Sequence, residues 1–450
     1  MIPELFLERM KKMLGEEYPA FYNALTEDAV KGARLNKLKV CENATRFPFL
    51  KEALPYCDGG FILDSDCQIG RTPHHHAGMI YVQDPGAMAT VGALEIGEDW
   101  WVADLCSAPG GKSSQALQYL TKGFLLANEY VPKRAKIIVS NLERLGASRA
   151  IVTSLDTGEL AKMYEGVFDL VIADAPCSGE GMFRKSEEAI EDWSEENVLA
   201  CAKRQEYILD NAAGMVKPDG YLLYSTCTYS MEENELTVLS FLKRHEEFSV
   251  AEVSPELIKV TRPGFANGAE GTGIERTRRF YPHVSRGEGQ YVALLKKDGA
   301  QYRPKINYKD AAKEPRADEK RIALDFLREN LEHIPDGRIA KCGENLVFIQ
   351  HGCPVPERGV FMSGVCLGQI KGKLLIPHHQ FFSAFGRLFK RRVELDEQMA
   401  QKYLLGEELP ASSCEKGYCA VTFLGVPIGG GKLSDGRLKN HYPKGLRNKQ

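Results

Sequence analysis

Short apolar runs alternate with helical patterns through the middle of the chain. Between about residue 100 and residue 297, the runs WWVADLC, GFLLANE, RAIVTSLD, FDLVIADAP and GYLLYSTC are interleaved with segments whose apolar residues recur at helical spacing. We expect helices over KSSQALQYL, from Pro132 to about Leu145, from about Ser194 to Met215 and from Glu232 to Arg244, and further strands at EFSVAEV and GQYVALLKK. Apolar strands that alternate with helices predict an α/β fold with a doubly wound parallel sheet, covered on both faces.

The segments on either side of this alternation have different patterns. Residues 1–80 begin with a helical pattern and continue into loop-rich sequence punctuated by proline and glycine. Residues 299–320 are polar and lack periodicity, as linkers do. Residues 321–450 contain a helical segment, short apolar runs and many glycines. We therefore divide the chain into an N-terminal region (1–80), an α/β domain (81–298), a linker (299–320) and one or two small C-terminal α+β modules (321–450).

Composition narrows the class of protein. Of the 450 residues 43% are apolar and 26% charged, so the chain can bury a sizeable core and is not a disordered or collagen-like protein. No apolar stretch has the length of a membrane span, and the N-terminus lacks a signal-peptide pattern, so we expect a cytoplasmic protein with no membrane partner. The 12 cysteines are then free thiols. We expect no metal site, because no CxxC pair occurs and the consecutive His74, His75 and His76 cannot readily converge on one ion.

The net charge of −3 hides an asymmetry along the chain. Residues 301–450 contain 25 Lys and Arg against 17 Asp and Glu, and the rest of the chain is acidic on balance. Segment 432–450 has a single acidic residue, Asp435, and its basic residues are Lys432, Arg437, Lys439, Lys444, Arg447 and Lys449. A solvated face is the ordinary explanation of such a run. Interleaved with His441 and Tyr442, it also suits contact with a phosphate backbone.

Two other segments have side chains that suit RNA. The turn RLNKLK offers Arg34, Asn36 and Lys39 to RNA phosphates, with an exposed basic turn as the competing interpretation. The segment HHQFF offers Phe381 and Phe382 as a surface on which an unpaired base could stack. For these phenylalanines we favour packing in the core.

Acidic residues close successive predicted strands. In an open α/β sheet, ligands bind outside the carboxyl ends of the strands. The first strand ends at Asp104 and runs into SAPGGK, which is neither a P-loop nor a GxGxxG motif, so a nucleotide phosphate is not the expected ligand. The next strands end at Glu129, Asp156 and Asp174. A helix-capping role explains any one of them. Together they favour an adenosine ligand without a phosphate, such as S-adenosylmethionine, with Glu129 on the ribose and Asp156 on the adenine edge.

Cys177 and Cys227 differ from the other cysteines. Free cysteine is commonly a small buried hydrophobic residue, and this describes most of the twelve. Cys177 and Cys227 instead lie in the polar turns APCSG and STCT, which follow adjacent predicted strands at the edge where the carboxylates gather. A thiolate is the nucleophile of cysteine chemistry, and nearby hydrogen-bond donors or positive charge favour it.

Two thiols, an acid and a methyl donor suit one reaction. Carbon 5 of cytosine is a poor nucleophile, but addition of a thiolate to carbon 6 converts the ring into an enamine that can attack a sulfonium methyl group. The ring then needs a proton or a strong hydrogen bond at N3, for which Asp174 is the candidate. A base must afterwards remove the carbon 5 proton, and the target base must be unpaired or flipped into the site.

These residues resemble the S-adenosylmethionine-dependent RNA cytosine-5 methyltransferases of the Sun/RsmF type. The resemblance covers roughly residues 20 to 297, and DAPCSG combined with STCT is its most specific part. The tail HYPKGLR looks like the C-terminal RNA-binding module of bacterial RsmF-like enzymes that modify 16S ribosomal RNA. The matching motifs are VQDPGAM (82–88), DLCSAPGGKS (104–113), ANE (127–129), DAPCSGEG (174–181), KPDGYLLYSTCTYSMEENE (217–235), RRFYPH (278–283) and GEGQYVALLKK (287–297).

The resemblance implies a Rossmann-like methyltransferase domain with S-adenosylmethionine as cofactor. It further implies RNA as substrate, most of all 16S ribosomal RNA or the small ribosomal subunit, RNA-binding flanking regions of which the last is PUA-like, and a monomer. In the family the Thr-Cys cysteine, here Cys227, attacks carbon 6, and the Pro-Cys cysteine, here Cys177, helps to release the product; Asp174 completes the catalytic set. The cofactor positions carry over as Cys106, Ser107, Ala108, Pro109, Gly110, Gly111, Lys112, Glu129, Asp156 and Asp174.

Other interpretations stay open at the level of sequence. A non-catalytic RNA-binding or ribosome-assembly factor could keep the fold, and transfer RNA could replace ribosomal RNA as the substrate. A thiol redox sensor would pair Cys177 with Cys227 in a disulfide and bind no cofactor. A Pro-Cys nucleophile, as in DNA cytosine methyltransferases, is disfavoured, because the matching Glu-Asn-Val triplet at 196–198 lies early in a helical pattern rather than at a strand end.

Overall fold

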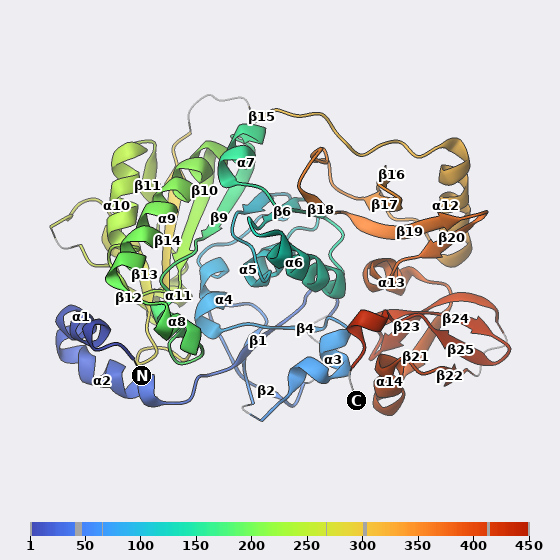
Figure 1. Ribbon diagram of the computed structural model, residues 1–450, viewed down its shortest axis with the longest axis horizontal. Coiled ribbons are helices and arrows are strands. Elements are labelled where there is room, and N and C mark those ends of the chain that lie inside the picture. Colours follow the sequence, from blue (N-terminus) through green and yellow to red (C-terminus); the bar gives the residue numbers. More distant parts are fainter. Residues whose placement is uncertain are drawn as a thin grey trace.

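A ten-stranded mixed sheet runs through the centre of the protein (Figure 1). The computed structural model describes residues 2–40, 47–64, 66–266, 268–299, 304–411 and 415–448; Lys449 of the basic C-terminal segment lies outside these ranges. The strand order is β12-β13-β14-β10-β9-β5-β6-β7-β18, and β11 pairs with β14. The strands are β5 (Trp101–Asp104), β6 (Phe124–Asn128), β7 (Ala150–Thr153), β9 (Phe168–Asp174), β10 (Val216–Thr226), β11 (Phe248–Val250), β12 (Arg262–Pro263), β13 (Arg278–Phe280), β14 (Gln290–Lys297) and β18 (Val360–Ser363).

The centre of the sheet is parallel and its edges are antiparallel. Strands β10, β9, β5, β6 and β7 run parallel, which confirms the predicted doubly wound α/β core. β14 is antiparallel to β10, and β13 is antiparallel to β14. The prediction of a parallel sheet is therefore wrong at this edge and at the other, where β18 is antiparallel to β7. For β13 and β14 the reason is the short loop that joins them, because a parallel neighbour needs a long crossover, usually a helix.

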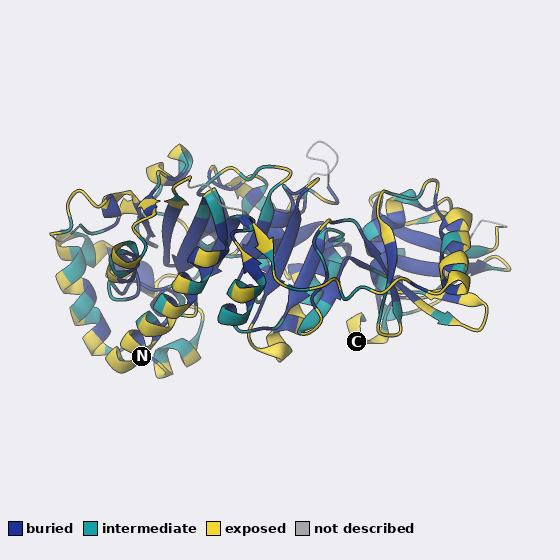
Figure 2. Cartoon of the chain, turned by 90° about the horizontal axis from the view of Figure 1, so that it is seen from above, coloured by how far each residue is buried: buried dark blue, intermediate teal, exposed yellow. Residues whose placement is uncertain are grey.

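Helices cover both faces of the sheet. The helices α7 (Thr157–Met163), α9 (Glu195–Met215) and α10 (Glu235–Arg244) pack on one face, and α4 (Pro85–Val91), α5 (Gly111–Leu117), α6 (Pro132–Leu145) and α11 (Pro255–Lys259) on the other. Successive residues of β9 alternate between these layers, with Val171 and Ala173 in the first and Leu170 and Ile172 in the second. Because both faces are covered, the central strands are continuously buried (Figure 2).

The N-terminal region has two parts. Helices α1 (Glu4–Leu14) and α2 (Tyr18–Thr26) place Phe6 and Phe21 against Tyr229, which lies just after β10. A four-stranded sheet follows, in the order β2-β3-β1-β4. The elements of this second part are β1 (Gly32–Leu35), β2 (Leu50–Ala53), β3 (Gly60–Leu63), η2 (Ile69–Arg71), α3 (Pro73–His76) and β4 (Ile80–Val82).

Two small modules form the C-terminal part, drawn in orange and red in Figure 1. Within the polar segment 299–320, β15 (Lys305–Ile306) pairs with β8 (Tyr164–Glu165), and α12 (Ala317–Asn330) begins before the segment ends. The first module has β16 (Arg338–Cys342), β17 (Asn345–Ile349), β19 (Val365–Lys371), β20 (Leu374–Pro377) and α13 (His379–Phe385). The second has β21 (Arg392–Leu395), α14 (Glu397–Leu405), β22 (Leu409–Pro410), β23 (Gly417–Phe423), β24 (Val426–Ser434) and β25 (Arg437–Asn440).

The turn that contains Lys39 is buried where three parts of the chain meet. The Lys39 Nζ donates hydrogen bonds to the carbonyl oxygens of Ala77 (2.9 Å), Arg144 (3.0 Å) and Pro427 (3.2 Å) and to Ser383 Oγ (2.8 Å). Arg34, Asn36 and Lys39 are 1%, 2% and 4% exposed, so the prediction that they contact RNA phosphates or form an exposed basic turn is wrong. Lys39 thereby joins the N-terminal region, α6 and both C-terminal modules, and the side chains of Arg34 and Asn36 also form their hydrogen bonds inside the protein.

Other predictions about the flanks have mixed outcomes. Phe381 and Phe382 are buried in the core, as expected. The three histidines lie in the short helix α3, and His76 Nδ1 lies 2.7 Å from the hydroxyl of the buried Tyr442. Among the residues that the structure describes, no helix has the length and apolar character of a membrane span, and no cluster of His, Cys, Asp or Glu could hold a metal ion.

Candidate active site

The residues expected to carry the chemistry gather at one edge of the central sheet. Strands β5, β9 and β10 all end at this edge, because neighbouring parallel strands point the same way. The side chains that follow them line a cavity of about 290 Å³. Its lining residues are Tyr81, Val82, Gln83, Asp84, Ala87, Asp104, Cys106, Ser107, Ala108, Pro109, Gly111, Lys112, Asp174, Met182, Cys227, Glu288, Gly289 and Gln290.

The glycine loop forms one wall of this cavity. Gly110 has a φ of +106° and turns the chain from the loop after β5 into α5, a conformation that a side chain would strain. The Ser107 amide donates to the carbonyl oxygen of Asn128 (2.8 Å), which anchors the loop to β6. The Ser113 hydroxyl donates to Asp104 Oδ2 (2.6 Å). The loop is therefore held from both sides and leaves its backbone open to a ligand.

Acidic groups and one lysine set the charge of the cavity. Burial raises the pKa of Asp104 to about 7, and its Oδ1 has no hydrogen-bond partner among the described residues. The Lys112 ammonium donates to Asp174 Oδ2 (2.8 Å), and the Ser225 hydroxyl donates to Asp174 Oδ1 (2.6 Å). A buried carboxylate oxygen without a partner favours a cationic or hydrogen-bond-donating ligand. These residues therefore fit the sulfonium and ammonium groups of S-adenosylmethionine.

The two cysteines face each other across the ends of β9 and β10. Their sulfur atoms lie 3.2 Å apart, and the backbone amide of Cys227 donates to the sulfur of Cys177 (3.3 Å). The neighbouring Cys227 sulfur and burial hold the pKa of Cys177 well above its usual range, so Cys177 stays a thiol. Cys227 is the one of the two that lines the cavity with Lys112 and Asp174. The two sulfurs thus have different surroundings: Cys227 faces the cavity, and Cys177 faces Cys227.

Two buried glutamates hold the cysteine loops, and the sequence interpretation did not include them. The Glu233 carboxylate accepts hydrogen bonds from the Ser178 amide (3.0 Å) and from Gln205 Nε2 (2.8 Å), tying the segment after Cys227 to the loop of Cys177. Glu180 accepts from the Thr228 hydroxyl (2.9 Å) and the backbone amide of residue 229 (3.0 Å). Their place inside the motifs DAPCSGEG and YSMEENE was the only signal available in the sequence.

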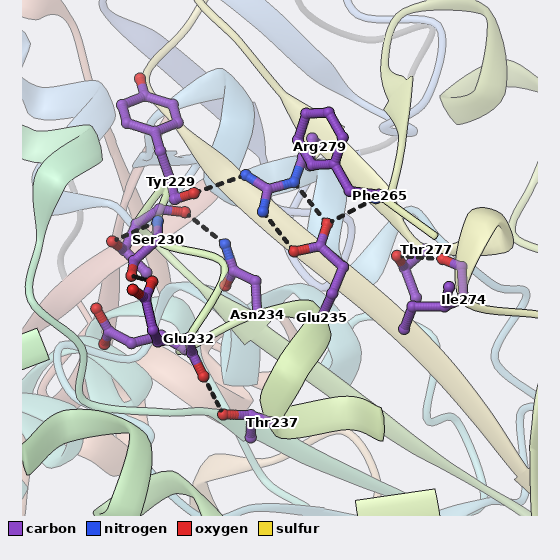
Figure 3. A network of polar contacts seen from close by, with 12 residues as sticks. Tyr229, Ser230, Glu232, Asn234, Glu235, Thr237, Phe265, Ile274, Thr277 and Arg279 are labelled. Atoms are coloured by element: carbon purple, nitrogen blue, oxygen red, sulfur yellow. Dashed lines mark hydrogen bonds and ion pairs between the residues drawn. The ribbon is translucent and has the colours of Figure 1, made fainter. Parts of the chain in front are cut away.

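A buried ion pair fixes the segment that follows Cys227 (Figure 3). The Arg279 guanidinium donates to both carboxylate oxygens of Glu235, with Nε at 2.6 Å from Oε1, and to the carbonyl oxygen of Tyr229 (2.7 Å). The side chains of Arg279 and Glu235 are 2% and 0% exposed. Asn234 Nδ2 donates to the carbonyl oxygen of Thr228 (3.0 Å). These contacts determine where the chain runs after the nucleophile candidate.

The remaining predicted cofactor residues lie further along the same edge, after β6 and β7. Glu129 is buried, accepts a hydrogen bond from the Val131 amide (2.9 Å) and lies 3.2 Å from Arg134 Nη1. Asp156 caps α7 through the Gly158 amide (2.9 Å) and accepts from the Tyr207 hydroxyl (2.7 Å). Neither lines the cavity around Cys227. Their roles toward the ribose and the adenine stay predictions.

Known proteins match this chain over almost its whole length. Three family models match: "16S rRNA methyltransferase RsmB/F" over residues 91–296, "N-terminal domain of 16S rRNA methyltransferase RsmF" over residues 2–85 and "Methyltransferase RsmF PUA domain" over residues 390–448. The chain is 30% identical to the ribosomal RNA small subunit methyltransferase F of Vibrio vulnificus, covering 99% of this chain and 97% of that protein. It is 29% identical to the protein of the same name from Klebsiella pneumoniae, covering 99% and 96%.

Solved structures agree with the fold of the central domain. A methyltransferase homologue from Pyrococcus horikoshii is 27% identical and superimposes with a TM-score of 0.56, covering 66% of this chain and 95% of that one. NSun6 from Pyrococcus horikoshii, solved with SFG, is 22% identical and superimposes with a TM-score of 0.53, covering 66% and 99%. About two thirds of this chain therefore has a fold already known from solved structures.

Proposed function

Since the chain belongs to the RsmF family of 16S ribosomal RNA methyltransferases, we propose that it methylates carbon 5 of a cytosine in 16S ribosomal RNA, with Cys227 as the covalent nucleophile. The observation that carries this proposal is the grouping of Cys227, Asp174 and Lys112 around one cavity at the sheet edge, with the Cys177 sulfur 3.2 Å from that of Cys227. The glycine loop, Asp104 and Glu129 would hold S-adenosylmethionine, which would supply the electrophilic methyl group.

Cys227 starts the reaction. Its thiolate bonds to carbon 6 of the unpaired base, and the electron pair of the carbon 5–carbon 6 double bond moves into the ring, which makes carbon 5 nucleophilic and N3 more basic. Asp174 holds a hydrogen bond or a proton at N3, and the ammonium of Lys112, 2.8 Å from its carboxylate, offsets the charge that this step moves. Cys227 and Asp174 therefore act on opposite sides of the ring.

Cys177 acts when the product leaves. After methyl transfer the proton on carbon 5 must be removed and the bond between carbon 6 and the Cys227 sulfur must break. Cys177 is protonated, and its sulfur lies 3.2 Å from that of Cys227, so it can pass its proton to the departing thiolate as it accepts the carbon 5 proton through water. This positions Cys177 at release and not at attack.

The flanking modules supply the RNA contacts. In the last module Lys432, Arg437, Lys439 and Lys444 are exposed, whereas Tyr442 is buried and cannot stack on a base. Exposed lysine and arginine on one module suit a phosphate backbone and make binding weaken as salt rises. We propose that the module holds RNA while the sheet edge receives the flipped base.

The proposal is tested by mapping 5-methylcytosine in 16S ribosomal RNA from cells with and without this protein. We expect one or more cytosines to lose the modification, and the purified protein to restore it on RNA or small subunits from the deficient cells, measured by transfer of a tritiated methyl group. A protein that binds this RNA and S-adenosylmethionine but transfers no methyl group would instead be a non-catalytic RNA-binding factor.

Replacing Asp174 with asparagine should lower the transfer rate about 10²- to 10⁴-fold, because an amide cannot protonate N3 and no longer pairs with Lys112. Asp169→Asn is a matched control on the same strand, since Asp169 bonds to the Trp101 amide (2.8 Å) at the end of β9 away from the cavity. Single-turnover transfer rates measure both variants. A near-normal rate for Asp174→Asn would remove Asp174 from the catalytic set.

The unfolding free energy should depend on pH through Asp104. Burial raises its pKa in the folded protein to about 7, whereas an unfolded aspartate has a pKa of about 3.9. Between these two pKa values the folded state keeps a proton that the unfolded state releases. The contribution of protonated Asp104 to the free energy of unfolding is therefore fully present below about pH 4 and lost as the pH rises through 7. The total loss is about 4 kcal/mol. Asp104→Asn should flatten this dependence, as measured by urea unfolding from pH 4.5 to 7.5. Parallel curves for variant and wild type would contradict the assignment.

A further inference from the structure

We infer that the side-chain amide of Gln290 donates a hydrogen bond to the O2 atom of the target cytosine. The inference rests on the proposed function and adds a contact at the edge of the base. It starts from a buried amide in the cavity of Cys227 that the mechanism above does not use.

Gln290 lies beside the nucleophile. It is the first residue of β14, whose start lies at the edge where β10 ends because the two strands are antiparallel. The register pairs Tyr291 with Thr226, so the next position along brings Gln290 next to Cys227. Gln290 and Cys227 line the same cavity as Lys112 and Asp174. A base bonded to Cys227 would therefore lie within the reach of the Gln290 side chain.

The side-chain amide of Gln290 has a hydrogen-bond donor that the described residues do not satisfy. The residue is 4% exposed, and its Nε2 has no hydrogen-bond partner among the described residues. Burying an amide donor without a partner is unfavourable, and native proteins rarely do so away from functional sites. The neighbouring Glu288 accepts a hydrogen bond from Arg184 Nε (2.9 Å) at Oε2, whereas its Oε1 has no hydrogen-bond partner among the described residues and lies 3.6 Å from Lys185 Nζ. That oxygen is an acceptor, so Gln290 supplies the unpartnered donor on this wall.

The hydrogen-bonding edge of the base selects O2. Along the sheet edge the sequence of strands is β14, β10, β9 and β5, so Gln290 lies on one side of Cys227, and Asp174 and the glycine loop lie on the other. The sulfur and the methyl donor reach carbons 6 and 5 from the faces of the ring, which leaves the edge of the ring to the surrounding side chains. The hydrogen-bond acceptors on that edge are N3 and O2, and N3 is assigned to Asp174. The Gln290 nitrogen donates hydrogen bonds, so O2 is the acceptor that remains for it.

A donor at O2 helps the reaction as well as the binding. Addition of the thiolate at carbon 6 shifts electron density to N3 and, through carbon 2, to O2. A fixed amide hydrogen bond at O2 therefore strengthens as the adduct forms, which lowers the barrier more than it improves binding. The expected signature is a loss in kcat with little change in KM when this hydrogen bond is removed.

The test compares two RNAs: a short fragment of 16S ribosomal RNA that contains the mapped cytosine, and the same fragment with 2-thiocytosine at that position. Sulfur accepts hydrogen bonds poorly, so the wild-type enzyme should be slowed about 10- to 100-fold on the second RNA. Gln290→Leu should be slowed by a similar factor on the first RNA and lose no more than about threefold on the second. If the leucine variant unfolds at too low a temperature for the assay, Gln290→Glu replaces it, because glutamate keeps the shape of the side chain but its carboxylate has no amide donor. Lys296→Leu, at the exposed far end of β14, should keep the full sensitivity of the wild type to sulfur.

The outcomes separate the two proposals. Equal sensitivity to sulfur in the wild type and in both Gln290 variants would overturn the contact while leaving the methyltransferase activity in place. Absence of transfer by the wild type to the unmodified fragment and to whole 16S ribosomal RNA would overturn the proposed function, and the contact with it.

Discussion

Replacing Cys227 with alanine is expected to abolish methyl transfer, with a rate loss of about 10⁴-fold or more, as removal of a covalent nucleophile does in other enzymes. Without the sulfur, carbon 5 of the base stays a poor nucleophile. The other thiol that lines the cavity, Cys106, lies in the glycine loop, and burial holds its pKa well above the usual range, while Cys177 points at Cys227. The measurement is transfer of a tritiated methyl group to 16S ribosomal RNA. S-adenosylmethionine binding, measured by calorimetry, should be retained and shows that the variant is folded.

The matched variant is Cys177→Ala. It keeps the nucleophile but removes the proton donor 3.2 Å from the Cys227 sulfur, so the covalent adduct should form and persist. The adduct is seen as a protein–RNA species that survives denaturing electrophoresis and disappears in the double variant. If the phenotypes were reversed, with Cys177→Ala inert and Cys227→Ala trapped on RNA, Cys177 would be the nucleophile.

The largest effect on stability should come from the ion pair between Arg279 and Glu235. Arg279→Met leaves the Glu235 carboxylate buried without its counter-charge and the Tyr229 carbonyl without its donor. Breaking a buried pair from one side costs about 3–5 kcal/mol. The free energy of unfolding should fall by that amount, as measured by urea denaturation, and the transfer rate should fall too, because the pair holds the segment after Cys227.

Two further variants separate burial from charge. Arg286→Met breaks the exposed pair of Arg286 with Glu52, whose side chains are 60% and 59% exposed, and should cost at most about 1 kcal/mol. A double variant, Arg279→Met with Glu235→Leu, should be more stable than Arg279→Met alone, because no uncompensated charge then stays buried. An effect of Arg279→Met no larger than that of Arg286→Met would disprove the importance of the buried pair.

Local pattern predicted the fold and most of the candidate site. The alternation of apolar strands and helices requires a sheet covered on both faces, so the residues that close the parallel strands must meet at one edge. For this reason the sequence alone predicts that four residues lie close together: Asp104, Asp174, Cys177 and Cys227. Arg34 and Lys39 show the limit of such reasoning, since a basic turn looks exposed in sequence whether or not other domains cover it.

The contacts made by β14 could not be predicted in this way. Gln290 lies 63 residues after Cys227 in the sequence, and the two become neighbours only because β14 pairs antiparallel with β10. The same holds for Glu233, whose hydrogen bond with the Ser178 amide joins residues 55 positions apart in the sequence. Polar residues of this kind carry no periodic signal, because their role depends on which strand lies beside them.

By itself, then, the amino-acid sequence determined the strand-and-helix alternation, the edge at which the chemistry gathers and the identity of the two thiols, because each depends on residues close together along the chain. Only the tertiary structure decided which thiol faces the cavity, which carboxylates are buried and hold protons, and which amide is left without a partner. Those properties depend on desolvation and on contacts between segments far apart in sequence, and both exist only once the chain has packed.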